Sequence, residues 1–427
     1  MIKKNRIFMT IAITFFLTLA AVLLAVNFKS GEKNVTRKLP RLYSADDPQF
    51  RRAIGSLLGP AIVGGNTAQE LHNGDQIFPA MLGAIRSAQH SITFETYIYW
   101  SGDIGREFAD ALAERARAGV KVHVLLDWLG SAKIESSFLK QMETAGVEIR
   151  QFHKPRWYTL AHLNNRTHRK LLVIDGKTGF TGGVGIAPQW TGKAQNAEHW
   201  RDSHFRIEGP VVAQMQAVFM DNWLKVTGQV MHGEAYFPPL QATGDVDAQV
   251  FSSSPSGGSE SMQLMYHLSI TAAQATINLS SAYFVPDKLT SQTLIAALKR
   301  GVKINIITPG EIIDTDVVRA ASRATWGPLL QAGAKIYEYQ PTMYHCKIMI
   351  VDQLLVSVGS TNFDNRSFRL NDEANLNVFD KRFAERLTRV FEDDLRKSRQ
   401  VTYEAWARRP LSEKIMERVA LLFGSQL

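Results

Sequence analysis

Twenty consecutive uncharged residues, from Ile7 to Val26, form the most apolar stretch of the chain. As a helix rising 1.5 Å per residue they span about 30 Å, the thickness of a bilayer core. A cleaved signal peptide has a shorter apolar region of about 7–15 residues and ends at an A-x-A-like site. Ala25-Val26-Asn27 matches such a site poorly. The pattern therefore favours a single transmembrane anchor over a signal peptide.

Basic residues flank this run on both sides, so the positive-inside rule leaves its orientation open. Those before it are Lys3, Lys4 and Arg6, and those after it are Lys29, Lys33, Arg37, Lys38 and Arg41. The excess on the C-terminal side leans towards a cytoplasmic catalytic region. The short N-terminal tail fits an anchor with its N-terminus inside equally well.

The rest of the chain repeats one pattern of apolar positions. Strand-like runs at 91–99, 117–127 and 144–152 recur at 276–284, 299–309 and 331–339. Between them apolar residues fall at helical spacing, as Phe108, Leu112 and Ala116 do, and Gly119 and Gly301 end the helices. Strands that alternate with helices predict an α/β fold with parallel sheets flanked by helices.

The stretch 252–259 is rich in Ser, Gly and Pro, which marks a boundary between the two copies. We therefore expect a tail and anchor at 1–28, a linker at 29–64, a first domain at 65–250, a second at 251–400 and an amphipathic tail at 401–427. In that tail one helical face is apolar, and either interfacial docking or packing on the domain would explain it. The face comprises Leu411, Ile415, Met416, Val419, Leu422 and Phe423.

After the third strand of each copy stands the motif H-x-K-x4-D-x6-G-[GS]. Its members are His168, Lys170, Asp175 and Gly182-Gly183, then His345, Lys347, Asp352 and Gly359-Ser360. Side chains two apart on a strand share a face, so each histidine points the same way as its lysine. Each aspartate is seven residues from its histidine and points the other way, so we interpret Asp175 and Asp352 as structural members of the motif.

This duplicated motif resembles that of the phospholipase D superfamily, and the layout looks most like the bacterial cardiolipin synthases. The similarity runs from about 65 to 410 and includes 95–100 (ETYIYW), 281–287 (SAYFVPD), 359–367 (GSTNFDNRS), Asn371 and Glu373. The resemblance implies two similar α/β/α sandwich domains related by a pseudo-twofold axis, preceded by one transmembrane helix. It also implies a location in a bacterial inner membrane.

The resemblance assigns roles within the site. It implies that His168 forms a phosphohistidine and that His345 acts as acid and then as base. Lys170, Lys347, Asn362 and Ser360 would hold the phosphoryl oxygens. An acidic residue about thirty positions downstream is expected to orient each histidine. This spacing selects Asp202, 34 positions after His168, and Glu373, 28 positions after His345.

Gly185 departs from the family pattern, which has Asn at this place, as Asn362 does in the second copy. We therefore expect the first half to lack one amide donor to the phosphate. No metal or cofactor is expected, since His199 and His204 have no further ligand-like neighbours. The single cysteine, Cys346, cannot form an intramolecular disulfide.

The net charge of +9, from 49 basic and 40 acidic residues, fits nucleic acid or anionic lipid headgroups as partner, and equally a solvated basic surface. The anchor, the loop 153–166 with its basic and aromatic residues, and the apolar face of the tail point to lipid. We predict a phosphatidyltransferase that makes cardiolipin from phosphatidylglycerol at a membrane, with no nucleic acid as partner. Three alternatives stay open: a phospholipase D that hydrolyses headgroups, a phosphodiesterase or nuclease, and a non-enzymatic membrane scaffold.

Overall fold

The computed structural model describes residues 2–27, 35–155, 164–255, 260–424 and 426. The apolar run lies in α1 (Ile2–Asn27), whose window Arg6–Leu23 is long and apolar enough to cross a membrane. None of that window is buried inside the protein. The centre of the basic and aromatic loop, 156–163, and residues 256–259 of the Ser-rich stretch lie outside the described residues.

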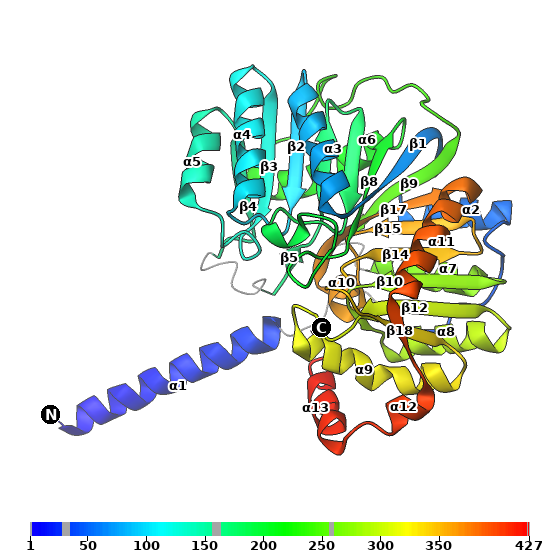
Figure 1. Ribbon diagram of the computed structural model, residues 1–427. Coiled ribbons are helices and arrows are strands. Elements are labelled where there is room, and N and C mark those ends of the chain that lie inside the picture. Colours follow the sequence, from blue (N-terminus) through cyan, green and yellow to red (C-terminus); the bar gives the residue numbers. More distant parts are fainter. Residues whose placement is uncertain (1, 28–34, 156–163, 256–259, 425, 427) are drawn as a thin grey trace.

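The first half contains three parallel strands (Figure 1). They are β2 (Ser91–Thr96), β3 (Lys121–Asp127) and β4 (Glu148–Phe152), connected through α4 (Asp103–Arg117) and α5 (Ser136–Thr144). Gly119 follows α4 at a φ of +89°, a left-handed conformation that glycine adopts without strain. The sheet continues antiparallel through β6 (Leu171–Ile174), β7 (Thr178–Gly182), β8 (Ser203–Glu208) and β1 (Val63–His72).

The second half repeats this plan. Its parallel strands are β10 (Thr276–Ser281), β12 (Lys303–Pro309) and β13 (Lys335–Tyr339), connected through α8 (Lys288–Lys299) and α9 (Asp316–Gln331). Its antiparallel strands are β14 (Lys347–Val351), β15 (Leu355–Gly359), β17 (Asn371–Phe379) and β9 (Val246–Ser253). An extra strand, β18 (Ser398–Val401), pairs with the edge of β13.

The expectation of parallel sheets is correct for three strands in each half and wrong for the others. A tight turn follows β6, with positive φ at Asp175 (52°) and Gly176 (64°), and a similar turn at Asp352 and Gln353 follows β14. Such a turn returns the chain directly as an antiparallel neighbour, whereas a parallel one needs a longer crossover. Each sheet is therefore mixed.

The two sheets meet edge to edge where β1 pairs with β9. The strand order is the same when counted outwards from this junction: β1-β8-β7-β6-β2-β3-β4 on one side and β9-β17-β15-β14-β10-β12-β13 on the other. This symmetry relates the two halves. The expected domain boundary at 250/251 falls inside β9, whose last two residues already belong to the Ser-rich stretch.

The remaining helices pack on these sheets or on other helices. They are α2 (Pro48–Leu58), α3 (Asn73–Ser87), α6 (Val212–Thr227), α7 (Glu260–Ala272), α10 (Asn365–Arg369), α11 (Lys381–Arg396), α12 (Tyr403–Ala407) and α13 (Leu411–Leu421), with a 3-10 turn at Pro188–Trp190. Three short strands complete the described chain: β5 (Arg166–Thr167), β11 (Phe284–Val285) and β16 (Phe363–Asp364).

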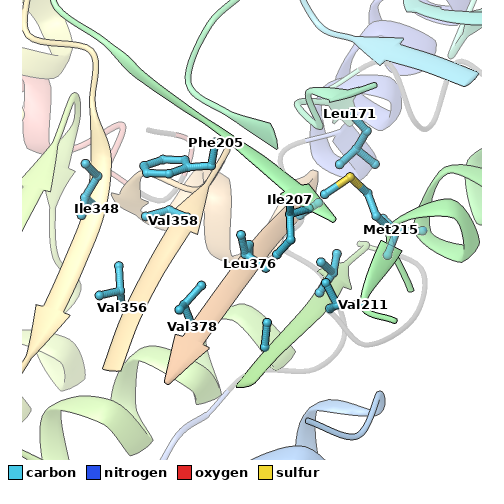
Figure 2. Close-up of a cluster of buried hydrophobic side chains, with 14 of the residues drawn as sticks. Leu171, Phe205, Ile207, Val211, Met215, Ile348, Val356, Val358, Leu376 and Val378 are labelled. Carbon is cyan, nitrogen blue, oxygen red and sulfur yellow. The ribbon is translucent and has the colours of Figure 1, made fainter. Parts of the chain in front are cut away.

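A shared hydrophobic core joins the two halves (Figure 2). Residues of β6, β8 and α6 from the first half belong to one buried cluster with residues of β14, β15 and β17 from the second. The cluster includes Leu171, Phe205, Ile207, Met215, Ile348, Val356, Val358, Leu376 and Val378. Burying a side chain of this size contributes roughly 1.5–3 kcal/mol, so this core holds the halves in a fixed relationship next to the two motifs.

Candidate active site

Each motif enters the site paired with a segment from the other half. β5, just before His168, runs parallel to β17, and the backbone N–H of His168 donates to the Asp372 carbonyl at 2.9 Å. In the second half, the segment just before His345 pairs in the same way with a segment of the first half. Arg201 forms a parallel bridge with Tyr344, and the N–H of His345 donates to the Arg201 carbonyl at 2.8 Å. The backbone therefore places each histidine beside the other half's acidic residue.

The histidine–carboxylate pairs accordingly cross between the halves. Nδ1 of His168 lies 3.0 Å from both carboxylate oxygens of Glu373, and Nδ1 of His345 lies 2.7 Å from Oδ2 of Asp202. The expectation that each acid serves the histidine of its own copy is wrong, because the strand pairings exchange the two acidic segments. With Nδ1 bound to a carboxylate, Nε2 is the nitrogen left for chemistry on each ring.

Both imidazoles line one cavity of about 440 Å³, together with Lys170 and Asn362. Nζ of Lys170 donates to the His168 carbonyl at 2.8 Å, and Nζ of Lys347 donates to the His345 carbonyl at 2.7 Å. Nζ of Lys347 also lies 3.2 Å from the ring nitrogens of His345. The cavity is of a size that holds a small-molecule headgroup.

Burial depresses the pKa of the basic groups in this cavity. Loss of solvent, together with the charge of Lys347, lowers the pKa of Lys170 to about 7. Burial also lowers the pKa of His168 to about 4, although the charge of Glu373 acts against it. For His345, burial and then the charge of Lys347 lower the pKa. Burial thus favours the neutral form of both rings.

The two orienting carboxylates remain ionised despite being fully buried. Burial acts to raise the pKa of Asp202, but the charge and hydrogen bond of His345 outweigh it and hold that pKa below its usual value. Burial acts in the same way on Glu373, where His168 and Lys170 outweigh it. An ionised carboxylate fixes the tautomer of its histidine and stabilises the imidazolium form.

The two motif aspartates lie away from the cavity. Asp175 accepts backbone hydrogen bonds from Gln89, His90 and Ser91 at 2.7–2.9 Å, where β2 begins. Asp352 accepts the equivalent bonds from Gln274, Ala275 and Thr276 at 2.8–2.9 Å, where β10 begins. Each carboxylate therefore fastens the turn after its motif strand to the start of the neighbouring strand.

Asn362 and Ser360, both expected at the phosphate, have different surroundings. Asn362 lines the cavity, and its buried Oδ1 has no hydrogen-bond partner. Ser360 is fully buried and does not line the cavity. Its hydroxyl donates to Oε2 of Glu373 and accepts the N–H of Ala374. Ser360 thus holds the carboxylate that orients His168, in place of the expected phosphate contact.

Trp190 fills the space that Gly185 leaves in the first half. A Cβ added at Gly185 would lie 2.8 Å from Cβ of Ile98 and 3.2 Å from Cζ3 of Trp190, so an asparagine does not fit there. The indole Nε1 of Trp190 donates to Oδ2 of Asp202 at 2.9 Å, and its ring lies edge-on to His345. The first half therefore has a donor to the carboxylate of the opposite histidine where the second half has Asn362.

The structure adds cavity residues to which the sequence had assigned no role in the site. Trp200 lies 5.5 Å from the ring centre of His345, and Tyr97 lies 5.3 Å from that of His168. The cavity is also lined by Arg166, Arg366, Tyr283 and Asp314. Aligning the two repeats residue by residue beyond the motif places Arg366 opposite Gln189, a difference that would have marked this position.

His199 and His204 do not share a metal-like cluster. The side chain of His204 is buried and that of His199 contacts Asn196. Among the residues that the structure describes, no group of three or more His, Cys, Asp or Glu side chains is arranged to hold a metal ion.

Comparison with known proteins gives the same picture as the geometry. A family model described as "Cardiolipin synthase, PLD-like domain" matches residues 81–223 and 267–395. Cardiolipin synthase 1 of Bacillus anthracis is 34% identical over 371 residues, covering 84% of this chain and 72% of that protein. The cardiolipin synthase of Geobacillus sp. (strain WCH70) is 35% identical over 360 residues, with the same coverage.

Among solved structures, phosphatidylserine synthase of Haemophilus influenzae has the same fold at 14% identity. It superposes with a TM-score of 0.67 over 89% of this chain and 100% of that one. Fold and site together define a phospholipase D-type phosphatidyltransferase built from two repeats. More particularly, the chain belongs to the cardiolipin synthase family of PLD-like proteins.

Proposed function

We propose that this protein makes cardiolipin and glycerol from two molecules of phosphatidylglycerol. The observation that carries the proposal is the pair of buried imidazoles on one cavity, each with Nδ1 on an ionised carboxylate and a lysine at its side. Such a centre suits transfer of a phosphoryl group through a covalent intermediate. The cardiolipin synthases to which the chain is similar indicate the substrate class.

In the first step, Nε2 of His168 attacks the phosphorus of the donor lipid and forms a P–N bond. The P–O bond to the headgroup glycerol breaks, and protonated His345 gives its proton to the departing oxygen. Phosphatidyl-His168 and free glycerol result. The negative phosphodiester beside His345 raises the pKa of that ring, which burial otherwise lowers, so the ring takes up a proton from solvent at neutral pH and can donate it.

In the second step, neutral His345 takes a proton from a glycerol hydroxyl of the second phosphatidylglycerol. The hydroxyl oxygen attacks the phosphorus, the P–N bond breaks, and its electron pair returns to His168. Lys170, Lys347 and Asn362 stabilise the charge on the phosphoryl oxygens in both steps. If water attacks in place of the lipid hydroxyl, the product is phosphatidic acid.

The test is product analysis with full-length protein in phosphatidylglycerol vesicles. We expect cardiolipin and glycerol in equal amounts, and loss of both in His168→Ala and in His345→Ala. His232→Ala, an exposed histidine outside the cavity, is the matched control and should keep full activity. Phosphatidic acid as the main product, or near wild-type activity in either cavity variant, would contradict the proposal.

We further propose that α1 anchors the protein in a bacterial inner membrane with the catalytic region on the cytoplasmic side. The apolar window supports the anchor, and the larger number of basic residues after it supports the orientation. His232→Cys in intact cells should resist a membrane-impermeant maleimide and react after lysis. Labelling in intact cells would place the catalytic region outside.

A further inference from the structure

The C-terminal helix α13 and the two residues after it expose an apolar face. Leu411 is 72% exposed, Met416 65% and Leu422 80%, and Ile415, Val419 and Phe423 are each more than half exposed. Outside α1, the other large exposed apolar side chains among the described residues are scattered over separate elements. A contiguous face of this kind marks a binding surface.

The opposite face of α13 is fully occupied, so the helix is fixed in this orientation. Ala420 packs with Val285, Val318 and Ala321. Glu417 is buried in ion pairs with Arg409 and Arg323, and Glu413 also pairs with Arg323. The acids of α13 thus face the protein, whereas Arg418 is exposed beside the apolar face. This charge distribution is complementary to an anionic surface.

Gly424 and Gln426, which follow this face in the chain, are hydrogen-bonded to residues next to the active-site cavity. The Gly424 carbonyl accepts from Nδ2 of Asn365 at 3.0 Å, and the Gln426 carbonyl accepts from Nη1 of Arg366 at 3.1 Å. Arg366 lines the cavity. Leu421 and Gly424 also border a groove of about 530 Å³, together with Val285, Pro328 and Asn365. The apolar face is therefore connected to the wall of the active-site cavity through Arg366.

We propose that this face, Leu411 to Phe423, docks on the surface of an anionic phospholipid bilayer. Its apolar side chains enter the boundary between headgroups and acyl chains, and Arg418 contacts lipid phosphates. Docking sets the cavity beside Arg366 at the membrane surface, where a lipid headgroup reaches the histidines without leaving the bilayer. The inference rests on the proposed function for its substrate, a bilayer phospholipid.

The depth of insertion tests the proposal directly. Cys346, the one cysteine of the chain, is fully buried, so Met416→Cys accepts a fluorescent label selectively. In full-length protein reconstituted in phosphatidylglycerol vesicles, spin-labelled lipids should quench a label at 416 several-fold more than one in Val230→Cys, a similarly exposed apolar site. Equal quenching at both sites overturns the proposal. Energy transfer between labelled copies, without lipid quenching, also overturns it and assigns the face to a second copy of this chain.

An activity comparison separates docking from chemistry. Ile415→Ser with Leu422→Ser should lower transfer in vesicles roughly tenfold, because two inserted side chains are lost. Its rate on dispersed short-chain phosphatidylglycerol should stay unchanged, as should both rates of the control Leu57→Ser with Val230→Ser. An equal loss on both substrates overturns the proposal. Labelled Met416→Cys protein that shows lipid quenching but makes no cardiolipin overturns the proposed function and leaves docking intact.

Discussion

Nδ1 of His168 lies 3.0 Å from the carboxylate of Glu373, a residue 205 positions further along the chain. The reciprocal contact joins His345 to Asp202 across 143 positions. Each half therefore supplies one imidazole and the carboxylate that orients the other.

Removing one carboxylate charge should affect the histidine of the opposite half. We expect Glu373→Gln and Asp202→Asn each to lower kcat by roughly 10²–10⁴-fold, because the ring loses its correct tautomer. In nitrogen NMR spectra, Glu373→Gln should shift the ring signals of His168 and leave those of His345 nearly unchanged. Asp202→Asn should do the reverse. Shifts confined to the histidine of the same half would contradict the crossed pairing.

A substrate with a good leaving group can show which histidine is the nucleophile and which is the proton donor. A phosphatidyl ester of nitrophenol needs little proton donation, so His345→Ala should still release a burst of nitrophenol. His168→Ala should release none, because no P–N bond forms. A burst from the His168 variant and none from the His345 variant would make His345 the nucleophile.

The alkaline side of the pH profile should report Lys170, whose pKa burial lowers to about 7. Below pH 7 the ammonium is charged and stabilises the transition state, and above it the neutral amine does not. We expect kcat/KM, which reports groups of the free enzyme, to fall about tenfold per pH unit above this value. Lys170→Arg should be less active but should lack this alkaline decline, because a guanidinium stays charged. An unchanged decline in that variant would assign it to another group.

Trp190 should act through Asp202 and not on the lipid. Trp190→Phe keeps most of the ring but removes the indole N–H that donates to Oδ2 of Asp202. The less stabilised carboxylate should raise the pKa of His345, moving its limb of the pH profile to higher pH, and kcat should fall roughly tenfold with little change in KM. Trp406→Phe removes a comparable indole bond, to the Arg323 carbonyl, and is the control. A change in KM alone would contradict this role.

Asp175 should contribute to stability more than to chemistry. Asp175→Asn replaces a charged acceptor of three backbone N–H groups while keeping a residue that tolerates the positive φ of 52°. We expect a loss of about 1–3 kcal/mol in the free energy of unfolding and a near-normal kcat at temperatures where the protein stays folded. Denaturant melts alongside activity measure both. A large loss of kcat at unchanged stability would place Asp175 in the chemistry.

Local sequence signals predicted the two repeats with their helices and parallel strands. They did not predict the antiparallel strands, most of whose pairings involve residues distant in the chain. Gly119 and Gly301 end helices in equivalent places, and apolar periodicity identified the three parallel strands of each half. The antiparallel return after β6 had a signal in Asp175-Gly176, a turn dipeptide, that the alternation of strands and helices obscured. The turn at Asp352 and Gln353 has no such signal.

In the active site, too, local sequence signals predicted some residues, whereas contacts between distant parts of the chain determined the others. The spacing of each motif identified His168, Lys170, His345 and Lys347, because side-chain alternation on a strand is local. No sequence spacing could pair Glu373 with His168, since that contact depends on β5 joining β17. The role of Trp190 depends on the space that the absence of a side chain at Gly185 leaves for the indole. The sequence alone does not show which side chain fills that space.

The exchange of carboxylates also makes both catalytic histidines depend on how the two halves are packed together. A small rotation of one half against the other would disturb both histidine–carboxylate contacts together. Substitutions in the shared core of Figure 2 that shift one half against the other should accordingly lower turnover before they unfold the chain.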